Sequence, residues 1–379
     1  MFEFLLILVG LSWILVFRYR RRNMYRMAVA IPAPDETIPL IGVAHKLMGS
    51  TEEIMSSLQR YSYDAIKHNG IVTMWLFHLL YFGRNIPVFG HVQNIGIDVA
   101  VFKQAACDVF YERLTKVIQS KREEFHMEKI SKDLEVDTHY DLGSHKSKTF
   151  LDLLITFSGD EKGYTNVELR EEMLTLTVAG TDTSAVGIGF TLELLAKYPK
   201  IQENIFQELY GIFGGSERAL VKEDLEKMKY LERVVKESLR LFPPVPFIIR
   251  KVLEDTRLPS GNVLPAGSGI FVSIWGIHRD PKYWGPEAEH FDPDRFLPQR
   301  FNVEHPCCYM PFSSGPRNCL GYQYAMISMK ASLSAILRRY KVVGEPEKGP
   351  VPRIRVKVDI MMKSVDGCQV ALERRPTKL

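Results

Sequence analysis

One cysteine of this 379-residue chain lies in a setting that favours metal binding by sulfur. Cys319 belongs to the segment Phe312-Ser-Ser-Gly-Pro-Arg-Asn-Cys-Leu-Gly321, in which Gly315 and Gly321 permit tight turns and close backbone approach. A helix is expected to follow, and the positive end of a helix stabilises thiolate, the form of cysteine that ligates iron. Arg317 is placed to pair with an anionic cofactor edge. A buried structural cysteine is the alternative, but it leaves Phe312 and Arg317 unexplained.

A second unusual segment, Ala179-Gly-Thr-Asp-Thr-Ser184, lies in the middle of a long expected helix. Its residues are poor helix formers, so a requirement other than helix stability selects them. Gly180 leaves room beside the helix, and Asp182 and Thr183 offer a carboxylate next to a hydroxyl, a pair suited to proton delivery. A helix bent by threonine and glycine for packing is the alternative.

These segments together resemble the cytochrome P450 family. The cysteine segment matches its haem-thiolate signature of Phe, two residues, Gly, one residue, Arg, one residue, Cys, one residue and Gly. The resemblance implies haem b, with Cys319 as axial iron ligand and no other covalent bond. It also makes Phe312, Gly315 and Arg317 cofactor-binding. Arg250 matches the family's strand arginine for a haem propionate, although an ordinary surface-strand residue would also fit.

The resemblance also explains two further features. Ala179 to Ser184 is similar to the family's oxygen-activation motif, in which Gly180 leaves room for dioxygen and Asp182 and Thr183 supply protons. Glu237 and Arg240, three residues apart on one helix face, would join Arg295 of the segment 291–296 in a buried cluster behind the cysteine loop. Without the resemblance, the first two would be read as a solvated helix face.

The amino-acid sequences of both motifs are most similar to those of the microsomal clan that includes fatty-acid ω-hydroxylases. Some members of that clan bind haem through a glutamate ester in the long helix. The corresponding residue here is Ala179, so no ester link is expected.

The implied activity is insertion of one atom of O2 into a lipophilic substrate. Electrons would come from NADPH through NADPH-cytochrome P450 reductase, with cytochrome b5 as a further partner. Residues 245–249 and the turn 363–367 would line the substrate side. Basic residues behind the cysteine could form a docking face, although exposed helix charges usually reflect solvation only; these are Lys330, Arg338 and Arg339. His278 and the Cys307-Cys308 pair are interpreted as structural.

Composition limits the partners and the compartment. A net charge of +4 is too small to indicate nucleic-acid binding. Five cysteines without paired spacing predict neither disulfides nor zinc, and so a reducing compartment. Residues 4–17 are apolar and precede a cluster of arginines at 18–22. A retained signal-anchor in the endoplasmic reticulum membrane is expected, with the remainder facing the cytoplasm; a buried soluble helix is the alternative.

Three regions follow: an anchor with its basic edge at 1–22, a proline-containing linker at 23–50, and a P450-like domain at 51–379. The match is good over 151–379 and poor over 78–130. The predicted fold class is mainly α with small β-sheets (α+β). Helices are expected at 51–69, 97–129, 165–197, from Pro199 to Gly214, at 224–241 and at 322–340, with strands at 71–77 and within 245–275.

The N-terminal, haem-covering part of the fold looks incomplete. A block on the order of a hundred residues is missing before the long helix, judged by the chain that the family needs to cover its haem. The family's Trp-x-x-x-Arg pair is absent, since neither Trp13 nor Trp75 has an arginine at that spacing. Three classes therefore stay open: a working monooxygenase, a truncated non-catalytic form that binds haem weakly or not at all, and an oxygen-independent haem-thiolate isomerase or dehydratase.

Overall fold

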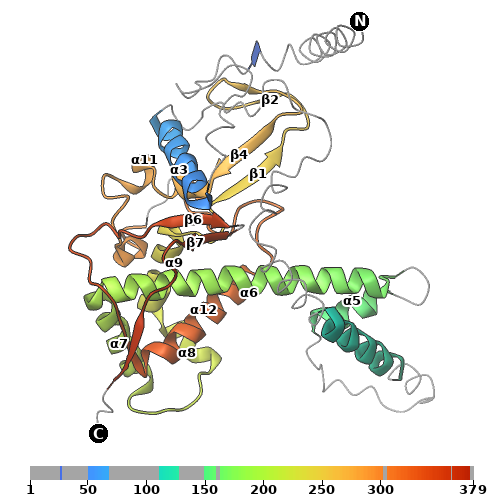
Figure 1. Cartoon of the computed structure of the whole chain (residues 1–379), viewed down its shortest axis with the longest axis horizontal. Coiled ribbons are helices and arrows are strands. Elements are labelled where there is room, and N and C mark those ends of the chain that lie inside the picture. The colour runs from blue at the N-terminus through green and yellow to red at the C-terminus, as the bar shows by residue number, and fades with distance from the viewer. Residues whose placement is uncertain are drawn as a thin grey trace, which may run out of the picture. The chain divides into compact units, whose positions relative to one another are not determined.

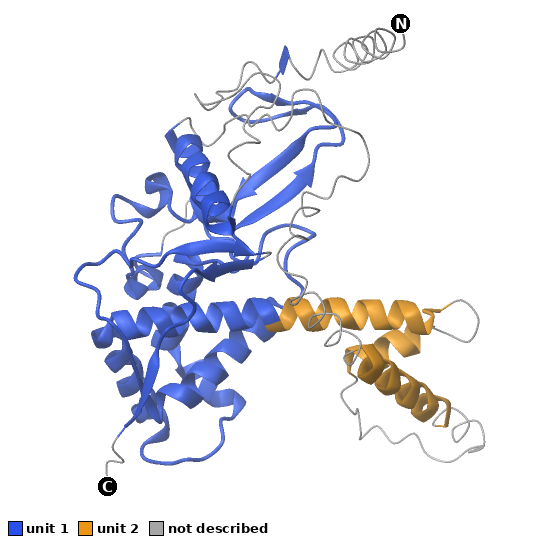
Figure 2. Ribbon diagram, in the orientation of Figure 1, with its two compact units in different colours: residues 1–81, 182–379 blue, residues 82–181 orange. Residues whose placement is uncertain are grey.

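The computed structural model describes residues 26–27, 50–67, 111–127, 149–158, 163–301, 305–359 and 361–375. The chain divides into two compact units, residues 1–81 with 182–379 and residues 82–181 (Figure 2). The expected anchor at 4–17, most of the linker and the strand at 71–77 lie outside the described residues. Within the described ranges, no helix is long and apolar enough to cross a bilayer.

The larger unit is mainly helical and contains four small antiparallel sheets among its described residues (Figure 1), which confirms the expected fold class. Its helices are α3 (Thr51–Lys67), the second part of α6 (Asn166–Lys197), α7 (Pro199–Phe213), α8 (Lys222–Lys227), α9 (Lys229–Leu241), α10 (Ile274–Ile277), α11 (Pro281–Trp284) and α12 (Tyr322–Leu337), with 3-10 turns η3 (Pro293–Phe296) and η4 (Pro306–Cys308).

Each sheet has two strands. The pairs are β1 (Phe247–Lys251) with β4 (Gly269–Ser273), β2 (Thr256–Arg257) with β3 (Val263–Leu264), β5 (Tyr340–Val343) with β8 (Ala371–Arg374), and β6 (Val356–Asp359) with β7 (Met361–Ser364). Within the first pair, Phe247 lies opposite Ser273 and Arg250 opposite Ile270. The expected turn after β7 is present, where Gly367 has a φ of +73°.

The core of the larger unit is built around α9, which packs against α7 and α12. Its side chains at Leu231, Val234 and Val235 are fully buried. Helix α6 approaches α12 closely, since a Cβ atom on Gly187 would lie 2.9 Å from Met329 Sδ. A larger residue at position 187 would therefore displace Met329.

The smaller unit contains the helical residues 111–127, α5 (Phe150–Ser158) and the first part of α6. Its core is formed by Ile118, Leu151, Leu154, Ile155 and Leu169. The start of α6 is capped reciprocally: Thr165 N donates to Glu168 Oε2 at 2.8 Å, and Glu168 N donates to Thr165 Oγ1 at 3.2 Å. These two bonds satisfy amides that the helix itself leaves without partners.

Two expected helices have different bounds in the structure. The predicted helix at 224–241 is two helices, α8 and α9, separated at Met228. The break is stabilised from outside, because Glu208 of α7 accepts from the amides of Tyr230 and Leu231 at 2.6 and 2.9 Å. The last helix ends at Leu337 instead of residue 340, because Tyr340 begins strand β5.

Candidate functional site

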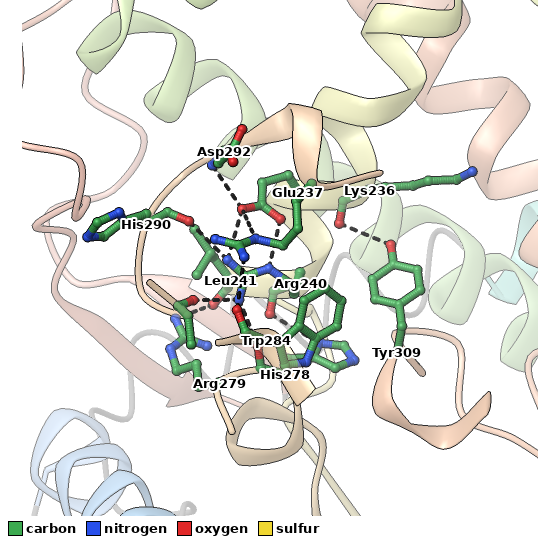
Figure 3. A network of polar contacts seen from close by, with 12 residues as sticks. Lys236, Glu237, Arg240, Leu241, His278, Arg279, Trp284, His290, Asp292 and Tyr309 are labelled. Atoms are coloured by element: carbon green, nitrogen blue, oxygen red, sulfur yellow. Dashed lines mark hydrogen bonds and ion pairs between the residues drawn. The ribbon is translucent and has the colours of Figure 1, made fainter. Parts of the chain in front are cut away.

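A buried ion pair between Glu237 and Arg240 occupies the centre of a polar network (Figure 3). Both side chains have 0% exposure, and two parallel bonds join them: Arg240 Nε to Glu237 Oε2 at 2.7 Å and Nη2 to Oε1 at 2.8 Å. The other guanidinium bonds go to the carbonyls of His278 (2.7 Å), Ala288 (2.6 Å) and His290 (3.0 Å). All five N–H groups of Arg240 therefore have acceptors.

Arg295 lies beside this pair, as the resemblance implied. Its Nε is 3.6 Å from Glu237 Oε1, while its outer nitrogens donate to the carbonyls of Trp284 and Glu287 at 3.0 and 2.8 Å. The same carboxylate oxygen accepts from Asp292 N at 2.9 Å. Buried charges are tolerated only when they are paired and hydrogen-bonded, and this carboxylate is both. A role in haem retention remains a prediction.

His278 is fully buried next to the cluster. Its Nδ1 lies 3.1 Å from the carbonyl of Arg240, and its Nε2 accepts a hydrogen bond from Met310 N at 2.9 Å. Burial, together with the charge of Arg240, lowers the pKa of His278 to about 3. The ring is therefore neutral at physiological pH, with its proton on Nδ1, because a carbonyl oxygen can only accept.

The cysteine loop is held by its own backbone. Cys319 N donates to Phe312 O at 2.9 Å, and Asn318 N donates to Gly315 O at 3.0 Å. Gly315 has a φ of +84°, a conformation that side chains disfavour, and Ser313 also has a positive φ of 63°. Gly321 has a φ of −93° and directly precedes α12. The thiol is exposed, three residues before the first helical residue.

The surroundings of Cys319 suit a flat apolar group with an anionic edge. The adjacent Leu320 side chain is 82% exposed, Tyr324 is 69% exposed and Ile327 is 50% exposed, a large apolar area for three neighbouring residues of a loop and a helix. Within the described ranges, no hydrogen bond or ion pair engages the Arg317 guanidinium. A thiol donor, apolar surface and a free cation fit a haem, so the residues present agree with the implied cofactor.

The oxygen-motif residues lie consecutively on α6, whose helical structure continues through them. Asp182 and Thr183 are half-buried, and Gly180 is exposed. A Cβ atom on Gly180 would meet no heavy atom within 4 Å. This open position agrees with the space that the motif reserves, although the assigned roles remain predictions.

The remaining predicted residues have mixed placements. Arg250 is exposed on β1 and, within the described part of the chain, donates one hydrogen bond, to the adjacent Ile249 carbonyl at 3.0 Å. The predicted basic docking face is contradicted at Lys330, which is buried, whereas Arg338 is half-buried and Arg339 is exposed. Lys330 is 7% exposed and bonds Glu232 at 3.0 Å, and Arg338 lies 3.7 Å over the Phe213 ring.

The sequence did not predict the contact between His278 and Met310. His278 was interpreted as structural, but nothing indicated that it bonds the segment leading to Cys319. Its partner is the backbone amide of Met310. A backbone amide has no sequence signature, so only the structure could reveal the contact.

Comparisons with known proteins identify the family of this chain. The family model for cytochrome P450 matches residues 98–367. The chain is 40% identical over 245 residues to Cytochrome P450 4g15 of Drosophila melanogaster, covering 64% of this chain and 42% of that protein. It is 38% identical over 264 residues to Cytochrome P450 4c21 of Blattella germanica, covering 69% and 51%. For human Cytochrome P450 4V2 the identity is 37% over 232 residues, covering 61% and 43%.

The match thus spans about half the length of these relatives or less. The family-model match at 98–367 includes the cysteine loop, the buried ion-pair cluster and the motif in the long helix. The chain therefore belongs to the cytochrome P450 family and is similar to members of its family 4.

Proposed function

We propose that the chain is a haem-thiolate monooxygenase that inserts one atom of O2 into a lipophilic substrate. The observation that carries this proposal is the Cys319 loop, which presents an exposed thiol, exposed apolar side chains and an Arg317 guanidinium that has no partner among the described residues. Membership of the cytochrome P450 family supports the assignment of haem binding to this loop. A haem b at this site would supply oxygen activation.

In this proposal each predicted site residue has one role. Cys319 would hold the iron through its thiolate, while Arg317 and Arg250 would neutralise the cofactor's carboxylates. Thr183 holds and passes a proton, and Asp182 replenishes it from solvent. Glu237, Arg240 and Arg295 fix the backbone on the cysteine side. Ala179 cannot form an ester, so the cofactor is retained without that link.

The first experiment is a carbon monoxide difference spectrum of reduced protein, normalised to haem content. The sample would be residues 23–379, compared with the full chain in detergent so that removal of the N-terminal segment is itself controlled. A red-shifted, thiolate-type Soret band at near-stoichiometric haem supports the proposal. A band at the position of a non-thiolate haem, or no haem at all, contradicts it.

Replacement of Thr183 tests the proton pathway. Thr183→Ala should uncouple electron use from product, because general acid catalysis contributes about 10²–10⁴-fold to such steps. The measurement is product formed per NADPH consumed, with reductase and a fatty acid as trial substrate. Thr177→Ala is the matched control on the same helix, since Thr177 Oγ1 donates only to the Met173 carbonyl within the described residues, at 2.7 Å. Equal coupling in both variants would remove the role of Thr183.

A second candidate is a non-catalytic form. The observation that favours it is coverage, because the match includes only 42% of the fly protein and 43% of the human one. An incomplete cover over the cofactor would admit water, so that uncoupled reduction of oxygen would compete with substrate oxidation. A correct thiolate band without substrate turnover would favour this candidate over the first.

The cellular setting is proposed as the endoplasmic reticulum membrane, with the larger part of the chain facing the cytoplasm. Residues 4–17 and the arginines that follow support it, as does similarity to a microsomal clan. NADPH-cytochrome P450 reductase is the proposed electron donor, with cytochrome b5 as a further partner.

A further inference from the structure

A continuous series of hydrogen bonds leads from the buried ion pair to the cysteine. Arg240 Nη1 donates to the His278 carbonyl at 2.7 Å, and the His278 ring accepts from Met310 N at 2.9 Å. The Met310 carbonyl in turn accepts from Ser313 N at 2.9 Å. The adjacent Phe312 carbonyl accepts from Cys319 N at 2.9 Å.

His278 is the only side chain in this series between the guanidinium and the loop, among the described residues. It is also clamped on both sides, since its Nδ1 bonds the Arg240 carbonyl at 3.1 Å. The ring therefore cannot rotate without losing both of its bonds. Stacking on Tyr309, with ring centroids 5.3 Å apart, restricts it further.

We infer that His278 is a positioning residue, which transmits the rigidity of the Glu237–Arg240 pair to the Cys319 loop through Met310. The ion pair alone cannot do this, because each of its hydrogen bonds to backbone goes to residue 278, 288, 290 or 292. The positioning of Cys319 matters only if the proposed function is correct, but hydrogen exchange can test the positioning without a bound cofactor.

The charge state of the ring supports this role. Burial and the neighbouring Arg240 keep the pKa of His278 far below its ordinary value. A protonated ring would carry a hydrogen on Nε2 and could not accept from Met310. The acceptor is therefore available throughout the physiological range.

Three substitutions in the full chain separate positioning from general stability. His278→Leu removes both ring bonds at similar volume. His278→Gln places an amide oxygen where Nε2 accepts, and so restores the bond to Met310. Tyr309→Phe is the matched control, because it keeps the stacked ring and loses only the bond from Tyr309 Oη to the Lys236 carbonyl at 3.0 Å, outside the series.

The primary readout is amide hydrogen exchange over residues 309–321, which requires no bound cofactor. His278→Leu should raise exchange at Met310, Ser313 and Cys319 about tenfold, the size expected when a local opening loses one hydrogen bond. His278→Gln should stay within about threefold of the unmodified chain, and Tyr309→Phe should leave these amides unchanged. Amides of α6 and α7 serve as internal references.

The second readout is the fraction of bound haem with a thiolate-type carbon monoxide spectrum. It should fall in His278→Leu, return in His278→Gln and stay unchanged in Tyr309→Phe. If the unmodified chain shows no thiolate band, the proposed function fails while the exchange data still decide the inference. Unchanged loop exchange in His278→Leu overturns it, as does an equal rise in α6 and α7, which would mean general destabilisation.

Discussion

At the scale of single residues, two carboxylates show how a charge is held below the surface. Glu237 is surrounded by Arg240, Arg295 and the amide of Asp292. Asp224 is joined to Arg218 by two bonds of 2.6 and 2.8 Å. The first pair is shielded from water on both sides, whereas the guanidinium of the second is 41% exposed. The two pairs should therefore respond differently to substitution.

Removal of Arg240 should be severe. Arg240→Ala leaves Glu237 as a buried charge without its bidentate partner and deprives three carbonyls of a donor, which should cost about 3–5 kcal/mol of unfolding free energy. The protein should also lose haem. The control is Arg339→Ala. Arg339 is an exposed arginine two residues after the end of α12, and its loss should change the free energy of unfolding by less than about 0.5 kcal/mol. Urea unfolding and haem content of both variants check this; a mild effect of Arg240→Ala would contradict it.

Asp224 should make the folded state less stable at acidic pH. Hydrogen bonds from Arg218 lower the pKa of Asp224 to about 2, from an ordinary value of 3.8. Because the folded-state pKa is the lower one, the stabilisation is present above pH 4 and is lost as the pH falls toward 2. The stability difference between the unmodified chain and Asp224→Asn should shrink by about 1 kcal/mol between pH 5 and pH 3.

Urea unfolding at the two pH values measures this difference. Asp359→Asn is the control, since among the described residues its ion-pair partner, Lys363 Nζ, lies 4.0 Å away and both side chains are partly exposed. A difference between the chain and Asp224→Asn that stays constant with pH would show that the pair is not what stabilises Asp224.

At the scale of elements, α6 carries two glycines with opposite surroundings. A Cβ atom on Gly180 would meet nothing within 4 Å, whereas one on Gly187 would lie 2.9 Å from Met329 Sδ and 3.5 Å from Leu239 Cδ2. Only the second glycine is required for the packing of α6 on α12.

A paired substitution tests this distinction. Gly180→Ala should raise the unfolding free energy by up to about 1 kcal/mol through helix propensity. Gly187→Ala gains the same propensity but forces Met329 to move, at a cost of about 1–3 kcal/mol for overpacking. Thermal unfolding of the two variants side by side measures the difference. Equal midpoints would show that Met329 adapts freely.

The sequence predicted the elements whose signals are local. It predicted a helix from residue 165, where Thr165 and Glu168 cap α6, and one from Pro199, where α7 begins. It missed the break at Met228, because the carboxylate that caps α9 comes from Glu208, about twenty residues earlier on another helix. It also misjudged Lys330, which is buried and paired with Glu232 of α9. Long-range partners of this kind leave no local pattern.

In the candidate site, too, the sequence predicted the local motifs and missed a long-range contact. The motifs located the cysteine loop and the ion pair because each has a fixed spacing of residue types. The bond between His278 and Met310 was not predictable, since one partner is a backbone amide. The family resemblance, and not periodicity, placed Arg295 next to Glu237.

At the scale of the whole molecule, the N-terminal apolar segment should determine membrane attachment. Deletion of residues 1–22 is expected to move the protein from the pellet to the supernatant after carbonate extraction, because the apolar run at 4–17 is lost. Substituting the arginines at 18–22 by glutamine, with the apolar run intact, should leave pelleting unchanged. Unaltered pelleting of the deletion variant would refute an N-terminal anchor.

The larger unit is assembled from the two ends of the chain, since residues 1–81 fold with residues 182–379. Helix α3 packs on β6, and Glu52 pairs with Arg355 at 3.2 Å across some three hundred positions of sequence. During synthesis, α3 leaves the ribosome long before its partner strand exists, whereas the smaller unit is completed in one stretch. Its first native partner among the described elements, α10, begins at residue 274, so until then the apolar face of α3 has no native partner, and its packing is completed only with β6. The nascent chain should therefore depend on chaperones until α10 and β6 have been synthesised.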